Sequence, residues 1–166
     1  MPRITAPAIG KLKGERKAVM ITAYDATSAR LADEAADMIL VGDSLGMVVQ
    51  GRANTLAVTM DEMIYHSRIV AQCSEKAHLM GDMPFLSYQT SPADAVANAG
   101  RFLKEGGVQS VKLEGGARSL PAIEAIVRAD IPVMGHIGYT PQSEHKVGTG
   151  KVNRDADTLL KDAKLL

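Results

Sequence analysis

Short aliphatic runs alternate along the chain with longer segments in which apolar residues recur at helical spacing. The runs are bounded by glycine, proline or polar residues, which is typical of strands covered on both faces. Five such runs occur, at residues 18–24, 38–42, 78–82, 108–113 and 131–135. The pattern therefore predicts five strands of a largely buried sheet.

Helix start signals lie in the segments between these runs. Thr59 and Glu62 have the spacing of a capping box, and Ser91 places a capping residue before Pro92 at the first helical position. The predicted helices cover residues 28–36, 59–70, 91–106, 121–128 and 155–166. Residues 1–17 are predicted to be an irregular lead-in, because prolines and glycines interrupt any long apolar period.

The order of strands and helices predicts an α/β fold with a parallel sheet wrapped by helices. An open doubly wound sheet and a (β/α)8 TIM barrel both fit this order. A complete barrel usually needs about 250 residues, whereas the chain has 166 residues. The barrel interpretation thus implies roughly five βα units plus a final helix, in a single incomplete domain over residues 1–166.

Polar residues follow or end most of the predicted strands. They are Asp43 and Ser44 after the second run, Asp82 at the end of the third, Lys112 and Glu114 on the fourth, and His136 after the fifth. In both architectures, ligands bind at the carboxyl ends of parallel strands. Three converging carboxylates would repel one another and raise their pKa values, unless a hard cation such as Mg²⁺ lies between them. Asp43, Asp82 and Glu114 are therefore candidate metal ligands; the alternative is that each acid caps a helix or forms a surface ion pair.

A second motif indicates different chemistry. Residues 42–46 have the sequence Gly-Asp-Ser-Leu-Gly, which matches the nucleophile elbow of α/β-hydrolases. Ser44 would then be a nucleophile, with His136 as its base. However, the elbow must lead directly into a helix, and the β-branched, glycine-terminated segment 47–51 does not predict one. A serine hydrolase is therefore the less favoured hypothesis.

Composition narrows the choice of partners and compartment. Lysine plus arginine and aspartate plus glutamate both total 19, so the formal net charge is zero and no nucleic-acid or anionic membrane partner is indicated. The sequence predicts neither a secretory signal nor a membrane span. Cys73 is the only cysteine. A single thiol cannot form an internal disulfide, which favours a cytoplasmic location.

Six segments, in this order and spacing, resemble the ketopantoate hydroxymethyltransferase family. They are residues 21–25 (ITAYD), 37–47 (DMILVGDSLGM), 58–66 (VTMDEMIYH), 81–85 (GDMPF), 111–116 (VKLEGG) and 135–143 (GHIGYTPQS). The resemblance extends over nearly the whole chain. It implies a (β/α)8 barrel related in fold to the phosphoenolpyruvate mutase and isocitrate lyase group.

The resemblance also implies an activity and its ligands. The family transfers a hydroxymethyl group from 5,10-methylenetetrahydrofolate to 3-methyl-2-oxobutanoate, giving 2-dehydropantoate in pantothenate biosynthesis, and depends on Mg²⁺. By position in the motifs, the metal ligands are Asp43, Asp82 and Glu114. The residues that hold the keto acid are Asp43, Ser44, Asp82 and Lys112. His136 matches a histidine at the active-site end of the fifth strand and is a candidate catalytic residue.

The family's general base is a glutamate on the sixth strand, and no residue of the chain up to Leu166 inherits this role. The catalytic base of the chain is therefore unassigned. The resemblance further implies a homo-oligomer acting on small molecules. The remaining hypothesis is a non-catalytic remnant that binds Mg²⁺ and the keto acid without turnover.

Overall fold

A computed structural model of the chain describes residues 2–148, 150–152 and 154–166. Five strands form one sheet in the order β1-β2-β3-β4-β5, and every neighbouring pair is parallel. They are β1 (Met20–Thr22), β2 (Met38–Val41), β3 (His78–Asp82), β4 (Ser110–Glu114) and β5 (Val133–His136). Each overlaps a predicted run, and β3 has the predicted bounds. The parallel sheet of the predicted fold class is confirmed.

Helices connect the strands. They are α1 (Ala6–Gly10), α2 (Ala26–Ala35), α3 (Leu45–Val48), α4 (Met60–Cys73), α5 (Pro92–Lys104), α6 (Leu120–Arg128), α7 (Glu144–Val147) and α8 (Ala156–Leu165), with short 3-10 turns η1 (Ala117–Ser119) and η2 (Pro141–Ser143). None of the helices in the described residues is long and apolar enough to span a bilayer.

Local side-chain hydrogen bonds account for the helix starts. The Thr59 hydroxyl accepts a hydrogen bond from the Glu62 backbone N–H at 3.2 Å, and Glu62 Oε2 accepts one from the Thr59 N–H at 2.8 Å. This is the predicted capping box, which satisfies donors that the first helical turn leaves free. Ser91 caps α5 in the predicted position. Asp25 caps α2, so this helix begins earlier than predicted.

Three short helices, α1, α3 and α7, were absent from the sequence prediction. α1 lies within residues 1–17, where Thr5 caps it and Pro7 lies in its first turn, a position that tolerates a missing N–H. α3 begins directly after Ser44. The expectation that no helix follows Ser44 was therefore wrong: β-branched residues lower helix propensity only slightly, and one turn needs few residues.

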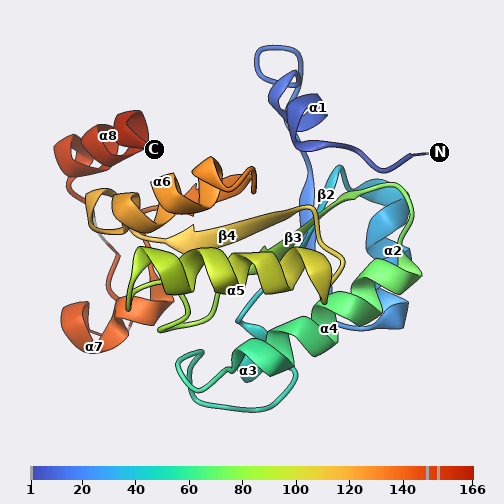
Figure 1. Ribbon diagram of the computed structural model, residues 1–166, viewed down its shortest axis with the longest axis horizontal. Helices are drawn as coiled ribbons and strands as arrows, with labels where there is room; N and C mark the ends of the chain where they lie inside the picture. The colour runs from blue at the N-terminus through green and yellow to red at the C-terminus, as the bar shows by residue number, and fades with distance from the viewer. Residues whose placement is uncertain (1, 149, 153) are drawn as a thin grey trace.

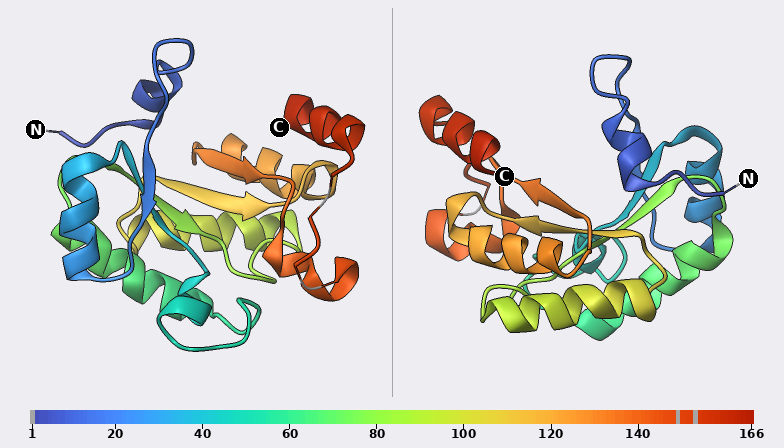
Figure 2. Two further views of the ribbon diagram at one scale, coloured as in Figure 1. Left: turned by 180° about the vertical axis from the view of Figure 1, so that it is seen from behind. Right: turned by 45° about the horizontal axis from the view of Figure 1, so that its top comes forward.

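The helices that follow β2, β3 and β4 lie together on one side of the curved sheet (Figure 1). The view from behind in Figure 2 shows the strands in front of α4 and α5. The apolar core fills the space between these helices and the sheet, where Phe102 of α5 packs over Gly81 of β3. A side chain at Gly81 would place its Cβ 2.3 Å from the Phe102 ring, so this close approach requires glycine.

The centre and the edges of the sheet differ in exposure. All residues of β3 and β4 are buried. In contrast, Met20 and Ile21 of the edge strand β1 are 45% and 37% exposed, and β5 is only partly buried. Since all strands run in the same direction, their carboxyl ends meet at one edge, which is where the predicted polar residues lie.

Candidate active site

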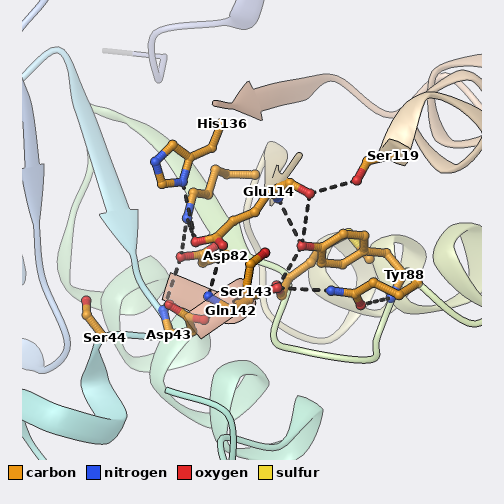
Figure 3. Close-up of polar contacts among 12 residues, drawn as sticks. Asp43, Ser44, Asp82, Tyr88, Glu114, Ser119, His136, Gln142 and Ser143 are labelled. Atoms are coloured by element: carbon orange, nitrogen blue, oxygen red, sulfur yellow. Dashed lines mark hydrogen bonds and ion pairs between the residues drawn. The ribbon is translucent and has the colours of Figure 1, made fainter. Parts of the chain in front are cut away.

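Four titratable side chains converge at the carboxyl edge of the sheet, and Figure 3 labels three of them, Asp82, Glu114 and His136. The Lys112 ammonium lies 2.9 Å from Asp82 Oδ2 and 3.6 Å from Glu114 Oε1. His136 Nδ1 lies 3.4 Å from the same Glu114 oxygen. Lys112 and Glu114 are two residues apart on β4, and the structure confirms that both point to the same side of the sheet.

Asp43 joins this group from the loop after β2. Its backbone N–H donates a hydrogen bond to Asp82 Oδ2 at 3.2 Å. Asp43, Asp82, Lys112, Glu114, His136 and Ser44 together line a cavity of about 400 Å³. The structure thus brings all six predicted site residues to one place. What each of them binds stays a prediction.

Burial changes the pKa values of two of the acids, Asp82 and Asp43. It raises the pKa of Asp82 to about 7, against the opposing effect of the nearby Lys112 ammonium. Burial likewise raises the pKa of Asp43. For Lys112, burial alone would lower the pKa, but the surrounding carboxylates outweigh it and the net shift is upward. Lys112 therefore remains a cation in a pocket of carboxylates.

The carboxylates can be compared with the needs of a metal ion. Among residues 2–148, 150–152 and 154–166, no group of three or more His, Cys, Asp or Glu side chains is arranged to hold a metal, and Lys112 lies between Asp82 and Glu114. However, Asp82 Oδ1 and Glu114 Oε1 are buried without a hydrogen-bond partner in the described chain. Buried, unsatisfied carboxylate oxygens are the ligands that Mg²⁺ prefers. The residues thus fit the ion chemically.

Ser44 lies at the other side of the cavity. Its hydroxyl is 2.8 Å from the Tyr24 hydroxyl, whereas His136 lies next to Glu114. The backbone of Ser44 has φ −55° and ψ −14°, an unstrained helical conformation rather than the strained turn of a nucleophile elbow. These contacts suit a hydrogen-bonding group and do not support the serine hydrolase hypothesis.

Two buried residues of the site had no role in the sequence analysis. The Gln142 side-chain amide donates hydrogen bonds to Asp43 Oδ2 and to the Met83 carbonyl, both at 2.9 Å, and its backbone N–H donates to Glu114 Oε2 at 3.1 Å. The Tyr88 hydroxyl, whose pKa is raised by burial, donates a hydrogen bond to Gln142 Oε1 at 2.7 Å. Gln142 belongs to the family-like segment 135–143, which was the one signal available.

The fold resembles that of a class of (β/α) barrel enzymes. A solved 2,3-dimethylmalate lyase, described as a PEP mutase/isocitrate lyase superfamily member, aligns with 99% of this chain and 60% of its own at a TM-score of 0.67 and 18% identity. A phosphonopyruvate hydrolase in complex with oxalate and Mg²⁺ aligns with 75% of this chain and 48% of its own at a TM-score of 0.63 and 13% identity. At these identities the likeness concerns the fold.

Sequence comparison specifies the family within this class. Residues 3–166 match the ketopantoate hydroxymethyltransferase family, and the chain belongs to it. Curated relatives named 3-methyl-2-oxobutanoate hydroxymethyltransferase include those of Desulforapulum autotrophicum (54% identical, covering 98% of this chain and 62% of the relative) and Anaeromyxobacter sp. (55% identical, covering 99% and 57%). A third, from Syntrophomonas wolfei, is 54% identical and covers 100% and 62%. The chain therefore spans about three fifths of the length of these relatives.

Proposed function

We propose that the chain contributes the keto-acid and metal site of an enzyme that transfers a hydroxymethyl group from 5,10-methylenetetrahydrofolate to 3-methyl-2-oxobutanoate, giving 2-dehydropantoate. The proposal depends on one observation above all, namely the buried Lys112 ammonium surrounded by Asp82, Glu114 and Asp43 at the carboxyl edge of a barrel-type sheet. Family membership supports it, since the relatives carry this activity in their names.

Mg²⁺ would be held by Asp43 and Asp82, with Glu114 as the third acid. Support comes from Asp82 Oδ1 and Glu114 Oε1, which are buried without a hydrogen-bond partner in the described chain, and from the structural neighbour solved with oxalate and Mg²⁺, a small carboxylate and metal on the same fold. When bound, the ion would supply positive charge that stabilises the negative charge developing on the keto oxygen as the substrate loses a proton.

The other residues would bind the keto acid. The Lys112 ammonium can pair with its carboxylate, because the acid cluster keeps this amine charged. Ser44 can donate a hydrogen bond to the same end of the molecule while Tyr24 fixes its hydroxyl. Leu40 and Met47 line the same cavity and offer apolar contact to the branched alkyl group. His136, next to Glu114, is the candidate for a further catalytic role.

We further propose that residues 1–166 form one incomplete barrel domain of a cytoplasmic homo-oligomer. The open edge supports the incomplete barrel, since Met20 and Ile21 of β1 expose apolar surface that additional strands of a barrel would cover.

Calorimetry of 3-methyl-2-oxobutanoate binding, with Mg²⁺ and with EDTA, tests the proposal. We expect binding that requires Mg²⁺ and is lost in Asp82→Asn. Asp25→Asn is the matched control, because Asp25 also follows a strand but caps α2 outside the cavity. Equal binding in EDTA, or undiminished binding in Asp82→Asn, would contradict the proposed metal site.

A further inference from the structure

We propose that Gln142 is a positioning residue. Its side chain holds the Asp43 carboxylate in the orientation that is required to bind the metal ion and the keto acid. Gln142 lies in η2, on the loop that follows β5. It reaches back across the sheet edge toward β2, 99 residues earlier in the chain (Figure 3). The inference rests on the proposed function of the site and adds to it a residue outside the acid cluster.

The hydrogen-bond partners define the orientation of the Gln142 amide. Its Nε2 faces two acceptors, Asp43 Oδ2 and the Met83 carbonyl. Its Oε1 faces two donors, the Tyr88 hydroxyl at 2.7 Å and the Gln89 amide at 3.1 Å. A flipped amide would put an oxygen against the Asp43 carboxylate and another carbonyl, so only one orientation satisfies all four contacts. The side chain is therefore held in one orientation, and Gln142 is only 5% exposed.

Gln142 contacts two carboxylates by separable means. Its side chain holds Asp43, whereas its backbone N–H holds Glu114 Oε2. Substitution of the side chain removes the first hydrogen bond and leaves the donor of the second in place. The effect of the Asp43 contact can thus be measured while the Glu114 contact is retained.

Asp43 is held differently from its neighbours. Lys112 forms ion pairs with Asp82 and Glu114, whereas the Asp43 carboxylate accepts a hydrogen bond from the Gln142 amide at 2.9 Å and is further stabilised by Thr55 and by the more distant Lys112 charge. Groups that orient a ligating carboxylate typically change metal affinity about 10- to 100-fold when removed. A buried carboxylate without its donor would rotate toward another partner, and its oxygens would no longer face the cavity in a fixed direction.

The test compares Gln142→Met with Gln89→Met. Methionine matches glutamine in length but cannot donate to Asp43. Gln89 is exposed and contacts the same Gln142 oxygen without touching Asp43, so its variant is the matched control. Binding of Mg²⁺ with 3-methyl-2-oxobutanoate is measured by calorimetry, thermal unfolding is recorded in parallel, and Mn²⁺ replaces Mg²⁺ for paramagnetic resonance. We expect about 10- to 100-fold weaker binding in Gln142→Met, with an altered Mn²⁺ spectrum, and wild-type values in Gln89→Met.

A second variant, Gln142→Glu, distinguishes the contact with Asp43 from the contacts that hold the loop. It also provides a test if the methionine variant folds poorly. Glutamate keeps an acceptor for Tyr88 and Gln89 but presents an oxygen to Asp43, so we expect binding at least as weak as in Gln142→Met. Wild-type affinity in Gln142→Glu, or a variant that loses thermal stability while its folded form binds normally, would overturn the positioning role. A wild-type chain without Mg²⁺-dependent binding would instead overturn the proposed function, and this inference with it.

Discussion

The two faces of the central strands have opposite chemistry although they alternate residue by residue. On the helix side, Leu79 of β3 and Val111 and Leu113 of β4 are fully buried in the apolar core. On the inner side, Asp82, Lys112 and Glu114 are nearly as buried but form an ion-pair cluster. Burial alone therefore does not distinguish a structural residue from a functional one here; the chemistry of the buried group does.

The polar residues of the inner face lower the stability of the fold in a way that the apolar helix face does not. Burial raises the pKa values of Asp82 and Asp43, and Asp82 Oδ1 and Glu114 Oε1 are buried without hydrogen-bond partners in the described chain. Groups of this kind persist where they bind something. The comparison predicts that substitutions on the helix face change stability and that substitutions on the inner face change binding.

Phe102→Ala should have the largest effect on stability. Phe102 is fully buried and fills the space over Gly81, so truncation leaves a cavity that costs about 3–5 kcal/mol of unfolding free energy. Urea denaturation measures this loss. The fraction that remains folded should bind 3-methyl-2-oxobutanoate with wild-type affinity, and a specific binding defect would break the division between the two faces.

Lys112→Met should act mainly on binding. Losing one partner of a buried charge pair costs about 2–5 kcal/mol of binding energy, so we expect the keto acid to bind about 100-fold more weakly or not at all. Stability should fall less than in Phe102→Ala, because Asp82, with its pKa already near 7, can take up a proton when the ammonium is removed. Calorimetry and urea denaturation of one sample check both parts; a variant that binds normally would contradict the role of Lys112.

The pH dependence of stability should show the raised pKa of Asp82. EDTA keeps metal ions out of the site. Under this condition the Asp82 carboxyl of the folded chain keeps its proton up to about pH 7, whereas an aspartate of the unfolded chain has a pKa of about 3.9. The contribution of this carboxyl to stability is thus full below about pH 4 and is lost as pH rises to about 7. Asp82→Asn should lack this loss, so wild type should decline relative to the variant across that interval. The free energy of unfolding of both proteins is measured by urea denaturation at several pH values. The same pH dependence in wild type and Asp82→Asn would contradict the raised pKa of Asp82.

Ser110→Ala should have the smallest effect. It tests whether an inner-face residue outside the acid cluster contributes to stability alone. Ser110 Oγ lies 2.7 Å from His78 Nε2 at the amino end of the strands, two residues before Lys112 on β4. Loss of this hydrogen bond should cost about 1 kcal/mol of stability, measured by urea denaturation. Binding of the keto acid should stay unchanged; weaker binding would mean that the whole inner face acts as one site.

Local sequence was sufficient for much of the fold. The strand at His78–Asp82, the capping box of Thr59 and Glu62 and the start of α5 after Ser91 all agree with the structure. Each depends on residues within a few positions of one another. α1, α3 and α7 escaped prediction because helices of four or five residues have too little apolar periodicity to detect.

The residues of the candidate site also fall into two groups: those that the sequence predicted and those that only the tertiary structure revealed. The sequence by itself determined which acids and which lysine stand at the strand ends, because the alternation of a strand places Lys112 and Glu114 on one side and parallel strands bring their ends to one edge. Only the tertiary structure decided that Gln142 returns over that edge to Asp43, that Tyr88 supports it, and that Tyr24 holds Ser44. These contacts join segments far apart in the chain, and their geometry depends on how the loops fold over the sheet.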